Sequence, residues 1–190
     1  MKNDPLEQQT IIDFVLEDEA HIDAAARMSQ VFPFVQRAIV HPMYDQLEAT
    51  LRQTLGAEWE IYNCRDEFLI EGFPAFCVSR KSWGEVYVAF ENQTRQGTST
   101  VGVWRKKAPE TSAMDAALVD AFANAGFTGE PSPYWPWYQE LPKDRGDWNA
   151  APALSAMRFE RDEFVRDLAD RLLAVHKVAT PVIDKFRGTK

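Results

Sequence analysis

The spacing of hydrophobic residues changes twice along the chain, from a helical pattern to the alternation of strands and back to a helical pattern. In the first part, leucines recur every four residues after Met43 and stop at Gly56, the position of a glycine that ends a helix. This spacing predicts a helical stretch over residues 17–55. Because proline lacks a backbone N–H, we expect the stretch to be broken or kinked near Pro33 and Pro42.

The middle of the chain has the alternating pattern of β-strands and is rich in β-branched and aromatic residues. Val86, Val88 and Phe90 share one face, which we expect to be buried. The connections are too short for parallel crossovers, so the pattern predicts an antiparallel sheet. Four strands are expected, over residues 59–64, 74–80, 85–92 and 99–107.

Two helices and an irregular segment follow the strands. Thr111 or Ser112 caps the first helix, and residues 162–178 carry the apolar stripe of the second, which we expect to break at Pro181. Between them, residues 127–153 contain five prolines, which prevent regular structure over any length.

The order of these elements predicts an α+β fold. It has a broken N-terminal helical stretch, an antiparallel sheet of about four strands, packing helices and an aromatic, proline-rich loop. The length suits a single domain over residues 1–190, in which residues 1–16 are left open as a flexible arm. No apolar run approaches the length of a membrane span, and the N-terminus lacks the pattern of a secretory signal. We therefore expect a cytoplasmic protein that does not cross a membrane.

The net charge of −8 is concentrated near the N-terminus, with −7 in residues 1–60. Phosphate binding needs clustered lysine and arginine, so direct binding of nucleic acid is not expected. The densest acidic cluster consists of Glu17, Asp18, Glu19 and Asp23. It is either a solvated helix end or a surface for a protein partner with a basic surface.

Sequence motifs of catalysis and of metal binding are absent. The three histidines lie far apart without zinc-ligand spacing, and Cys64 and Cys77 do not form a C-x-x-C pair. Neither a G-x-S-x-G elbow nor a glycine-rich phosphate loop occurs in the sequence. We therefore expect no metal, no cofactor and no enzymatic activity, and leave the oligomeric state open.

A basic group follows the last predicted strand. Arg105, Lys106 and Lys107 end that strand, and residues 80–81 are expected beside them at the end of a neighbouring strand. The group either contacts an acidic or phosphate-bearing partner or keeps the edge of the sheet soluble.

Three tryptophans lie in the proline-rich segment. Trp135, Trp137 and Trp148 either anchor a partner or fill the core. In an extended backbone, Trp135 and Trp137 project to the same side, which predicts that they fill one groove. We expect all three to be mainly structural.

The strings VYVAFEN, VGVW, YWPWYQEL and DWN, with an alanine-rich helix between the second and third, form one further pattern. Over about residues 20–180 it resembles the C-terminal segment that follows the nuclease-like core in some bacterial PD-(D/E)XK superfamily proteins. That superfamily's chemistry requires an acid-x-Lys tripeptide, which this chain lacks, so the resemblance implies an accessory segment and no catalytic residue.

Together these observations predict a non-enzymatic protein that acts by binding a protein through its acidic surface. An inhibitor, an immunity protein or a regulator of a bacterial defence or mobile-element system would act in this way. The alternative is an accessory domain associated with a nuclease or with a complex that processes nucleic acid.

Overall fold

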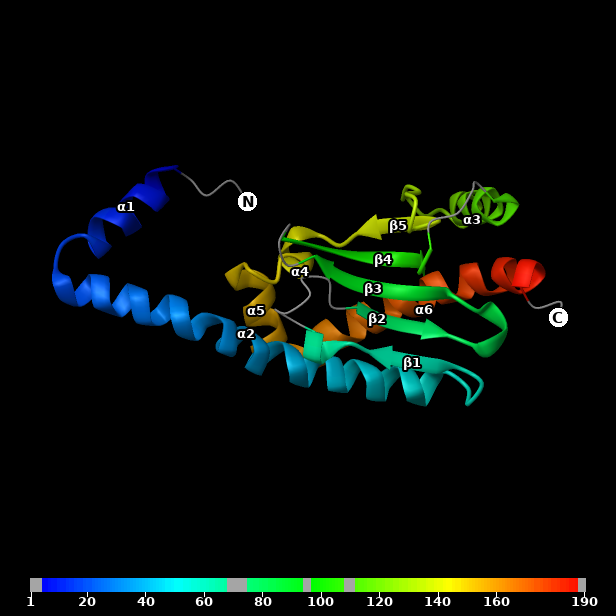
Figure 1. The fold of residues 1–190 in the computed structure, drawn as a ribbon, viewed down its shortest axis with the longest axis horizontal. Helices are drawn as coiled ribbons and strands as arrows, with labels where there is room; N and C mark the ends of the chain where they lie inside the picture. Colours follow the sequence, from blue (N-terminus) through cyan, green and yellow to red (C-terminus); the bar gives the residue numbers. More distant parts are fainter. Residues whose placement is uncertain (1–4, 68–74, 94–96, 108–111, 188–190) are drawn as a thin grey trace. The chain divides into compact units, whose positions relative to one another are not determined.

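The computed structural model describes residues 5–67, 75–93, 97–107 and 112–187. The fold is α+β, as predicted, with helices and an antiparallel sheet (Figure 1). The chain divides into two compact units, Met1–Ala38 (unit 1) and Ile39–Lys190 (unit 2). No helix in the described part of the chain is long and apolar enough to cross a membrane.

Unit 1 contains helix α1 (Pro5–Val15) and the first half of helix α2 (Glu19–Thr54). Helix α1 lies within the stretch that the sequence left open as a flexible arm. The turn between the helices ends at Asp18, whose side-chain Oδ1 accepts a hydrogen bond from the backbone N–H of His21 at 2.8 Å. An acidic side chain at this position satisfies a free N–H at the start of α2.

Of the two predicted forms, a break or a kink near the prolines, the break is wrong, because α2 is continuous across both Pro33 and Pro42. An interior proline costs a helix about 3 kcal/mol through its missing hydrogen bond and its steric clash. Next to Pro42, the side chains of Val40, Met43 and Tyr44 are fully buried in unit 2. Their burial offsets the cost at Pro42, and the sequence pattern alone does not reveal it. At Pro33, the neighbouring Phe32 and Phe34 are exposed, and this explanation does not apply.

Within the described residues of unit 2, the sheet has five strands in the order β1-β2-β3-β4-β5, one more than the four expected. Every neighbouring pair is antiparallel, as expected from the short connections. The strands are β1 (Glu60–Asn63), β2 (Ala75–Ser79), β3 (Val86–Gln93), β4 (Thr98–Arg105) and β5 (Trp137–Glu140).

One face of the sheet packs against helices and forms the main core. Val86, Val88 and Phe90 belong to this core and are at most 1% exposed, which confirms the predicted buried face of β3. Figure 1 shows α6 (Arg161–Arg187) passing behind the central strands on this side. The α-helices that follow β4 in the chain are α3 (Ala113–Asn124), α4 (Lys143–Gly146), α5 (Ala151–Phe159) and α6 (Arg161–Arg187). Two short 3₁₀ helices, η1 (Arg65–Glu67) and η2 (Lys81–Trp83), follow β1 and β2.

The ends of α3 are those that the sequence predicts. The Ser112 hydroxyl accepts a hydrogen bond from the backbone N–H of Asp115, and so caps the first turn. Gly126 follows the helix with a φ of +81°, a backbone conformation that favours glycine. The alternative cap, Thr111, lies outside the described residues.

Strand β5, helix α4 and the first three residues of α5 lie within residues 127–153, where the five prolines were expected to prevent regular structure, so that prediction is wrong. Pro136 immediately precedes β5 and removes no hydrogen bond from the sheet, and Pro152 occupies the first turn of α5, where proline is tolerated. Glycines allow close approach to β5. A Cβ on Gly102 would lie 2.3 Å from the Trp137 carbonyl oxygen, and one on Gly129 would lie 2.4 Å from that of Tyr138.

Helix α6 extends beyond its predicted end and contains Pro181, so the expected break at this proline is also wrong. Ala179 and Ile183, on either side of Pro181, are completely buried in the main core. As at Pro42 in α2, tertiary packing compensates for the lost backbone hydrogen bond.

Trp137 connects β5 to α3 through the core. Its ring stacks on Phe122 with a centroid distance of 3.8 Å and lies edge-on to Phe127 at 5.8 Å. Trp137 is 2% exposed.

Replacing Trp137 with alanine should therefore lower the free energy of unfolding by about 3–5 kcal/mol, the usual cost of truncating a buried tryptophan. Urea denaturation followed by circular dichroism measures this loss. Tyr134→Ala is the matched control, because Tyr134 is 50% exposed and its loss should cost no more than about 0.5 kcal/mol. Equal stability of the two variants would contradict a structural role for Trp137.

Candidate functional site

The predicted acidic cluster lies at the turn between α1 and α2. Glu17 and Asp18 belong to the turn, Glu19 begins α2, and Asp23 lies one turn later. All four residues are exposed. The structure therefore brings the four predicted carboxylates to one end of the helix, where the helix dipole favours negative charge.

Two of these acids also have local structural roles. Asp18 caps α2, and Asp23 forms an ion pair with Arg27 at 2.8 Å. The Nδ1 atom of His21 lies 3.9 Å from the carboxylate of Glu17 and 3.7 Å from that of Asp18. Among the described residues, Glu19 is the member of the cluster that forms no ion pair.

The most unusual feature of unit 1 is its number of exposed apolar side chains, which the sequence analysis missed. Unit 1 contains eleven of the fifteen large hydrophobic side chains that are exposed in the described residues. They are Leu6, Ile11, Ile12, Phe14, Leu16, Ile22, Met28, Val31, Phe32, Phe34 and Val35.

Part of this apolar surface continues a stripe that is buried elsewhere on α2. Val40, Met43 and Leu47 lie three or four residues apart and are fully buried in unit 2. The same spacing, continued toward the N-terminus, reaches Phe32 and Ile22, which are 42% and 48% exposed. Exposed apolar side chains at such spacing on a helix are typical of a protein interface.

The predicted basic group does not form one surface. Arg105 is buried, and its guanidinium forms two hydrogen bonds with the Asp115 carboxylate, at 2.8 and 2.9 Å. Lys107 pairs with Glu85 at 3.3 Å, and Lys106 is exposed. Arg105 therefore stabilises the fold and is not free to contact a partner.

Residues 80–81, which were expected beside this basic group, also lie elsewhere. Residues 80–81 follow β2, and β3 separates β2 from β4, so the two basic segments do not end neighbouring strands. Arg80 instead forms an ion pair with Asp184 of α6.

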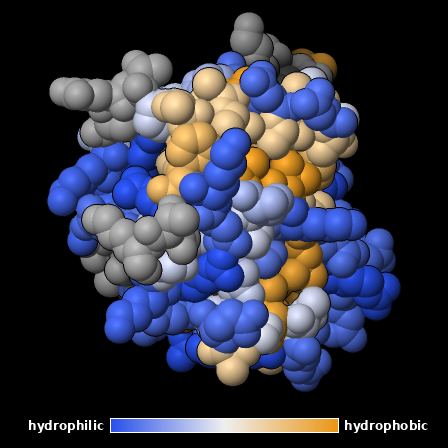
Figure 2. All heavy atoms as spheres, turned by 90° about the vertical axis from the view of Figure 1, so that its right-hand side faces the viewer, coloured by the Kyte–Doolittle hydropathy of each residue, from blue (hydrophilic) through white to orange (hydrophobic). Residues whose placement is uncertain are grey.

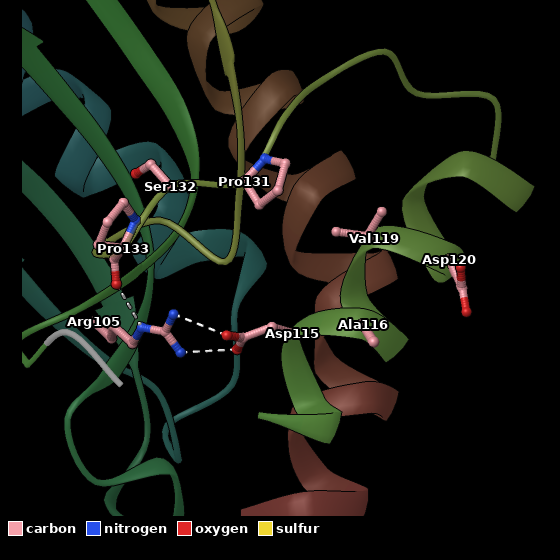
Figure 3. Close-up of a pocket in the computed structure, with 8 residues that line it drawn as sticks. All are labelled: Arg105, Asp115, Ala116, Val119, Asp120, Pro131, Ser132 and Pro133. Atoms are coloured by element: carbon pink, nitrogen blue, oxygen red, sulfur yellow. Dashed lines mark hydrogen bonds and ion pairs between the residues drawn. The ribbon is translucent and has the colours of Figure 1, made fainter. Parts of the chain in front are cut away.

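A cavity of about 580 Å³ lies beside the Arg105–Asp115 ion pair. Figure 3 shows its position between α3, which contributes Ala116 and Val119, and the segment that contains Pro131 and Pro133. Arg105 also donates from Nε to the carbonyl oxygen of Pro133 at 3.1 Å, so the ion pair ties β4 to both walls. The cavity is largely apolar and its guanidinium is already neutralised, which suits an apolar group better than a free anion.

Apolar surface is also present around this part of unit 2. Figure 2 looks onto the end of the molecule at which α3 and the C-terminal end of α6 lie, and shows orange and tan surface between hydrophilic side chains.

The three tryptophans of the proline-rich segment are buried, as predicted. Trp135, Trp137 and Trp148 are 7%, 2% and 0% exposed. The prediction that Trp135 and Trp137 fill one groove is wrong, because Trp137 belongs to the main core and Trp135 to a separate cluster with Cys77 and Ala89. A turn at Ser132–Trp135, closed by backbone hydrogen bonds in both directions, precedes β5 and interrupts the extended backbone that the prediction assumed.

A cluster that the sequence did not predict surrounds His176. Its ring lies edge-on to Trp59 with a centroid distance of 4.2 Å, and the Arg80 guanidinium lies 5.2 Å from the Trp59 ring. Trp83 donates from Nε1 to Asp184 at 2.7 Å. Burial, and secondly the positive charge of Arg80, lower the pKa of His176 to about 4. The residues come from segments about a hundred positions apart, so no local spacing marks them.

Metal ligands do not converge in the part of the chain that the structure describes, where no three His, Cys, Asp or Glu residues are placed to hold an ion. Comparisons of the chain with protein families, curated proteins and solved structures gave no match. The arrangement of the residues is therefore the basis for inferring function.

Acid should weaken the fold through His176. The neutral ring is favoured in the folded protein, whereas the unfolded chain takes up a proton near pH 6.5. The free energy of unfolding should therefore fall as the pH decreases from about 6.5 towards 4, by about 1–2 kcal/mol after allowance for solvent screening of the partly exposed ring. Urea denaturation at a series of pH values across this range measures the fall in the free energy of unfolding. His176→Phe should remove that part of the pH dependence, and an unchanged profile would contradict this assignment.

Removing the acceptor of the buried ion pair should be costly. Asp115→Ala leaves the Arg105 guanidinium buried without its carboxylate and should lower the free energy of unfolding by about 3–5 kcal/mol. Ser112→Ala, which removes only the helix cap, should cost about 1 kcal/mol. Asp120→Ala at the exposed rim of the cavity is the control and should have little effect. Denaturation midpoints compare the three variants, and a small effect of Asp115→Ala would show that the ion pair is dispensable.

Proposed function

We propose that the protein acts without catalysis, by binding another protein through unit 1, as an inhibitor, an immunity protein or a regulator does. The observation that carries the proposal is the group of eleven exposed apolar side chains among the described residues of α1, the turn after it and the first half of α2. Burying a side chain of this size stabilises a complex by about 1.5–3 kcal/mol, so a few of them supply substantial affinity.

The charge of unit 1 supports a basic partner. Residues 1–38 contain seven acidic and three basic residues, and the acids concentrate at the turn between α1 and α2. A second copy of the chain would bring like charges together at this surface, whereas a partner with lysine and arginine around an apolar groove complements both features. We therefore propose a partner of this second kind.

A carbodiimide, which joins carboxylates directly to lysines in contact, tests the proposal with the full chain as bait in an extract of its native host. We expect cross-links between partner lysines and the carboxylates of Glu17, Asp18, Glu19 or Asp23. The triple variant Phe14→Ser, Met28→Ser, Phe34→Ser should retain at least about tenfold less of that partner. Phe159→Ser is the matched control, because Phe159 is 79% exposed but belongs to unit 2.

Three outcomes would overturn the proposal. Cross-links from the partner could map to unit 2, or the triple variant could bind as well as the wild type. Sedimentation analysis could also show a dimer of the chain that the triple variant abolishes, which would make a second copy the occupant.

Charge reversal at the acidic turn should slow association with the cross-linked partner. Glu17→Lys, Glu19→Lys and Asp23→Lys together retain the Asp18 cap and should lower the association rate constant about tenfold at low salt, with the difference shrinking at high salt. Stopped-flow fluorescence measures the rate. Asp144→Lys, Glu160→Lys and Asp170→Lys reverse three exposed acids of unit 2 as the control, and an equal loss there would contradict a specific role for the turn.

A further inference from the structure

The two faces of the sheet differ in what covers them. Val88 and Phe90 on β3 point into the main core, so the alternating residues Tyr87, Ala89 and Glu91 belong to the opposite face, which we call the outer face. The apolar cluster on the outer face contains no residue of a described helix. In Figure 1, α6 lies behind the sheet, on the other side.

Aromatic rings form a layer over small residues on the outer face. Cys77, Ala89 and Gly102 are register neighbours on three successive strands, and the first two are 6% and 1% exposed. Such small side chains cannot bury themselves, and the rings of Tyr87, Trp104 and Tyr138 pack against their cluster. The ring centroids are 5.8 Å apart for Tyr62 and Tyr87, 5.3 Å for Tyr87 and Trp104, and 6.2 Å for Trp135 and Tyr138.

Carboxylates lie at both ends of this aromatic layer. The Tyr62 hydroxyl donates to Glu60, and the Tyr138 hydroxyl donates to Glu130 at 2.5 Å. These hydrogen bonds are the main cause that raises the pKa of each tyrosine to about 12, so both rings remain neutral. The hydrogen bonds also fix the orientation of the rings and of the two carboxylates.

Two further acids share the outer face by alternation, Glu91 on β3 and Glu140 on β5, and both are register partners of Thr100. Burial raises the pKa of Glu91 above its ordinary value. No lysine or arginine among the described residues forms an ion pair with Glu60, Glu91, Glu130 or Glu140. The outer face therefore combines π-rich rings with four carboxylates that lack a counter-charge.

We propose that the outer face binds the cationic side chains of an arginine-bearing peptide segment. The guanidinium groups lie over the rings of Tyr87 and Trp104, and the four carboxylates supply the counter-charge. Arginine fits this chemistry best, because its planar cation stacks on aromatic rings and pairs with carboxylates at the same time. The inference goes beyond the proposed function, since it concerns unit 2 alone and holds whether or not unit 1 binds a protein.

Isothermal titration of the full chain with a defined probe tests this inference. The probe is an acetylated and amidated heptapeptide in which glycine and arginine alternate, and its control has citrulline, the neutral isostere, in place of arginine. We expect the arginine peptide to bind at least about tenfold more tightly than the citrulline peptide at low salt. Glu60→Gln, Glu91→Gln, Glu130→Gln and Glu140→Gln together should weaken its binding about tenfold or more.

Two further variants separate this site from general charge attraction. Asp144→Asn, Glu160→Gln, Glu163→Gln and Asp170→Asn remove the same charge from exposed positions of unit 2 outside the outer face, and should leave the affinity within about twofold. Trp104→Leu keeps an apolar side chain but removes the ring, and should weaken arginine binding while thermal melting reports that the fold is intact.

The inference is overturned if the arginine peptide does not bind, if the citrulline peptide binds equally well, or if the control neutralisation weakens binding as much as the quadruple variant of the outer face. The charge reversal at the turn of unit 1 should not change peptide binding. Failure of this inference can therefore be distinguished from failure of the proposed function.

Discussion

Helix α6 packs along the face of the sheet that carries the main core, and most of unit 2 depends on this contact. One side of this helix is buried from Phe164 to Ile183, over almost its whole length, and its core residues contact those of β3, β4 and α3. This burial carries the helix past Pro181. It also brings Asp184 to Arg80 and Trp83, and holds the ring of His176 among aromatic residues. The burial of α6 thus explains both why the helix continues through Pro181 and why the pKa of His176 is lowered.

The sequence predicts best what depends on neighbouring residues. The alternation in β3 and the cap of α3 are local patterns, and both are confirmed. Strand β5, the continuous helices and the burial of Arg105 depend on contacts between distant segments, which no local spacing records. The four acids of the turn stand out in the sequence as a dense group of like charge, whereas no local pattern reveals the exposed apolar surface of unit 1. A periodic apolar pattern predicts that a helix face is buried, but not whether the surface that covers it belongs to the same chain.

The two proposed surfaces use one physical strategy in different geometries. Each places carboxylates beside apolar or aromatic groups, so that charge guides the approach of a cationic partner and burial supplies the affinity. In unit 1 the apolar part is a pair of helices, and in unit 2 it is a layer of rings on a sheet. Under these two proposals, the acids of a chain with a net charge of −8 would attract a partner only where the neighbouring apolar or aromatic surface also fits that partner.

The close approach of β5 to two glycines has a consequence for evolution. A side chain at Gly102 or Gly129 would meet backbone atoms of β5 at 2.3 and 2.4 Å, which no change of rotamer can relieve. Surface aromatics and acids can drift as partners change, but these two positions are constrained by the backbone itself. In a divergent relative that keeps the five-stranded sheet, paired glycines flanking the last strand should persist after the surrounding sequence has become unrecognisable, and they offer a marker of common ancestry.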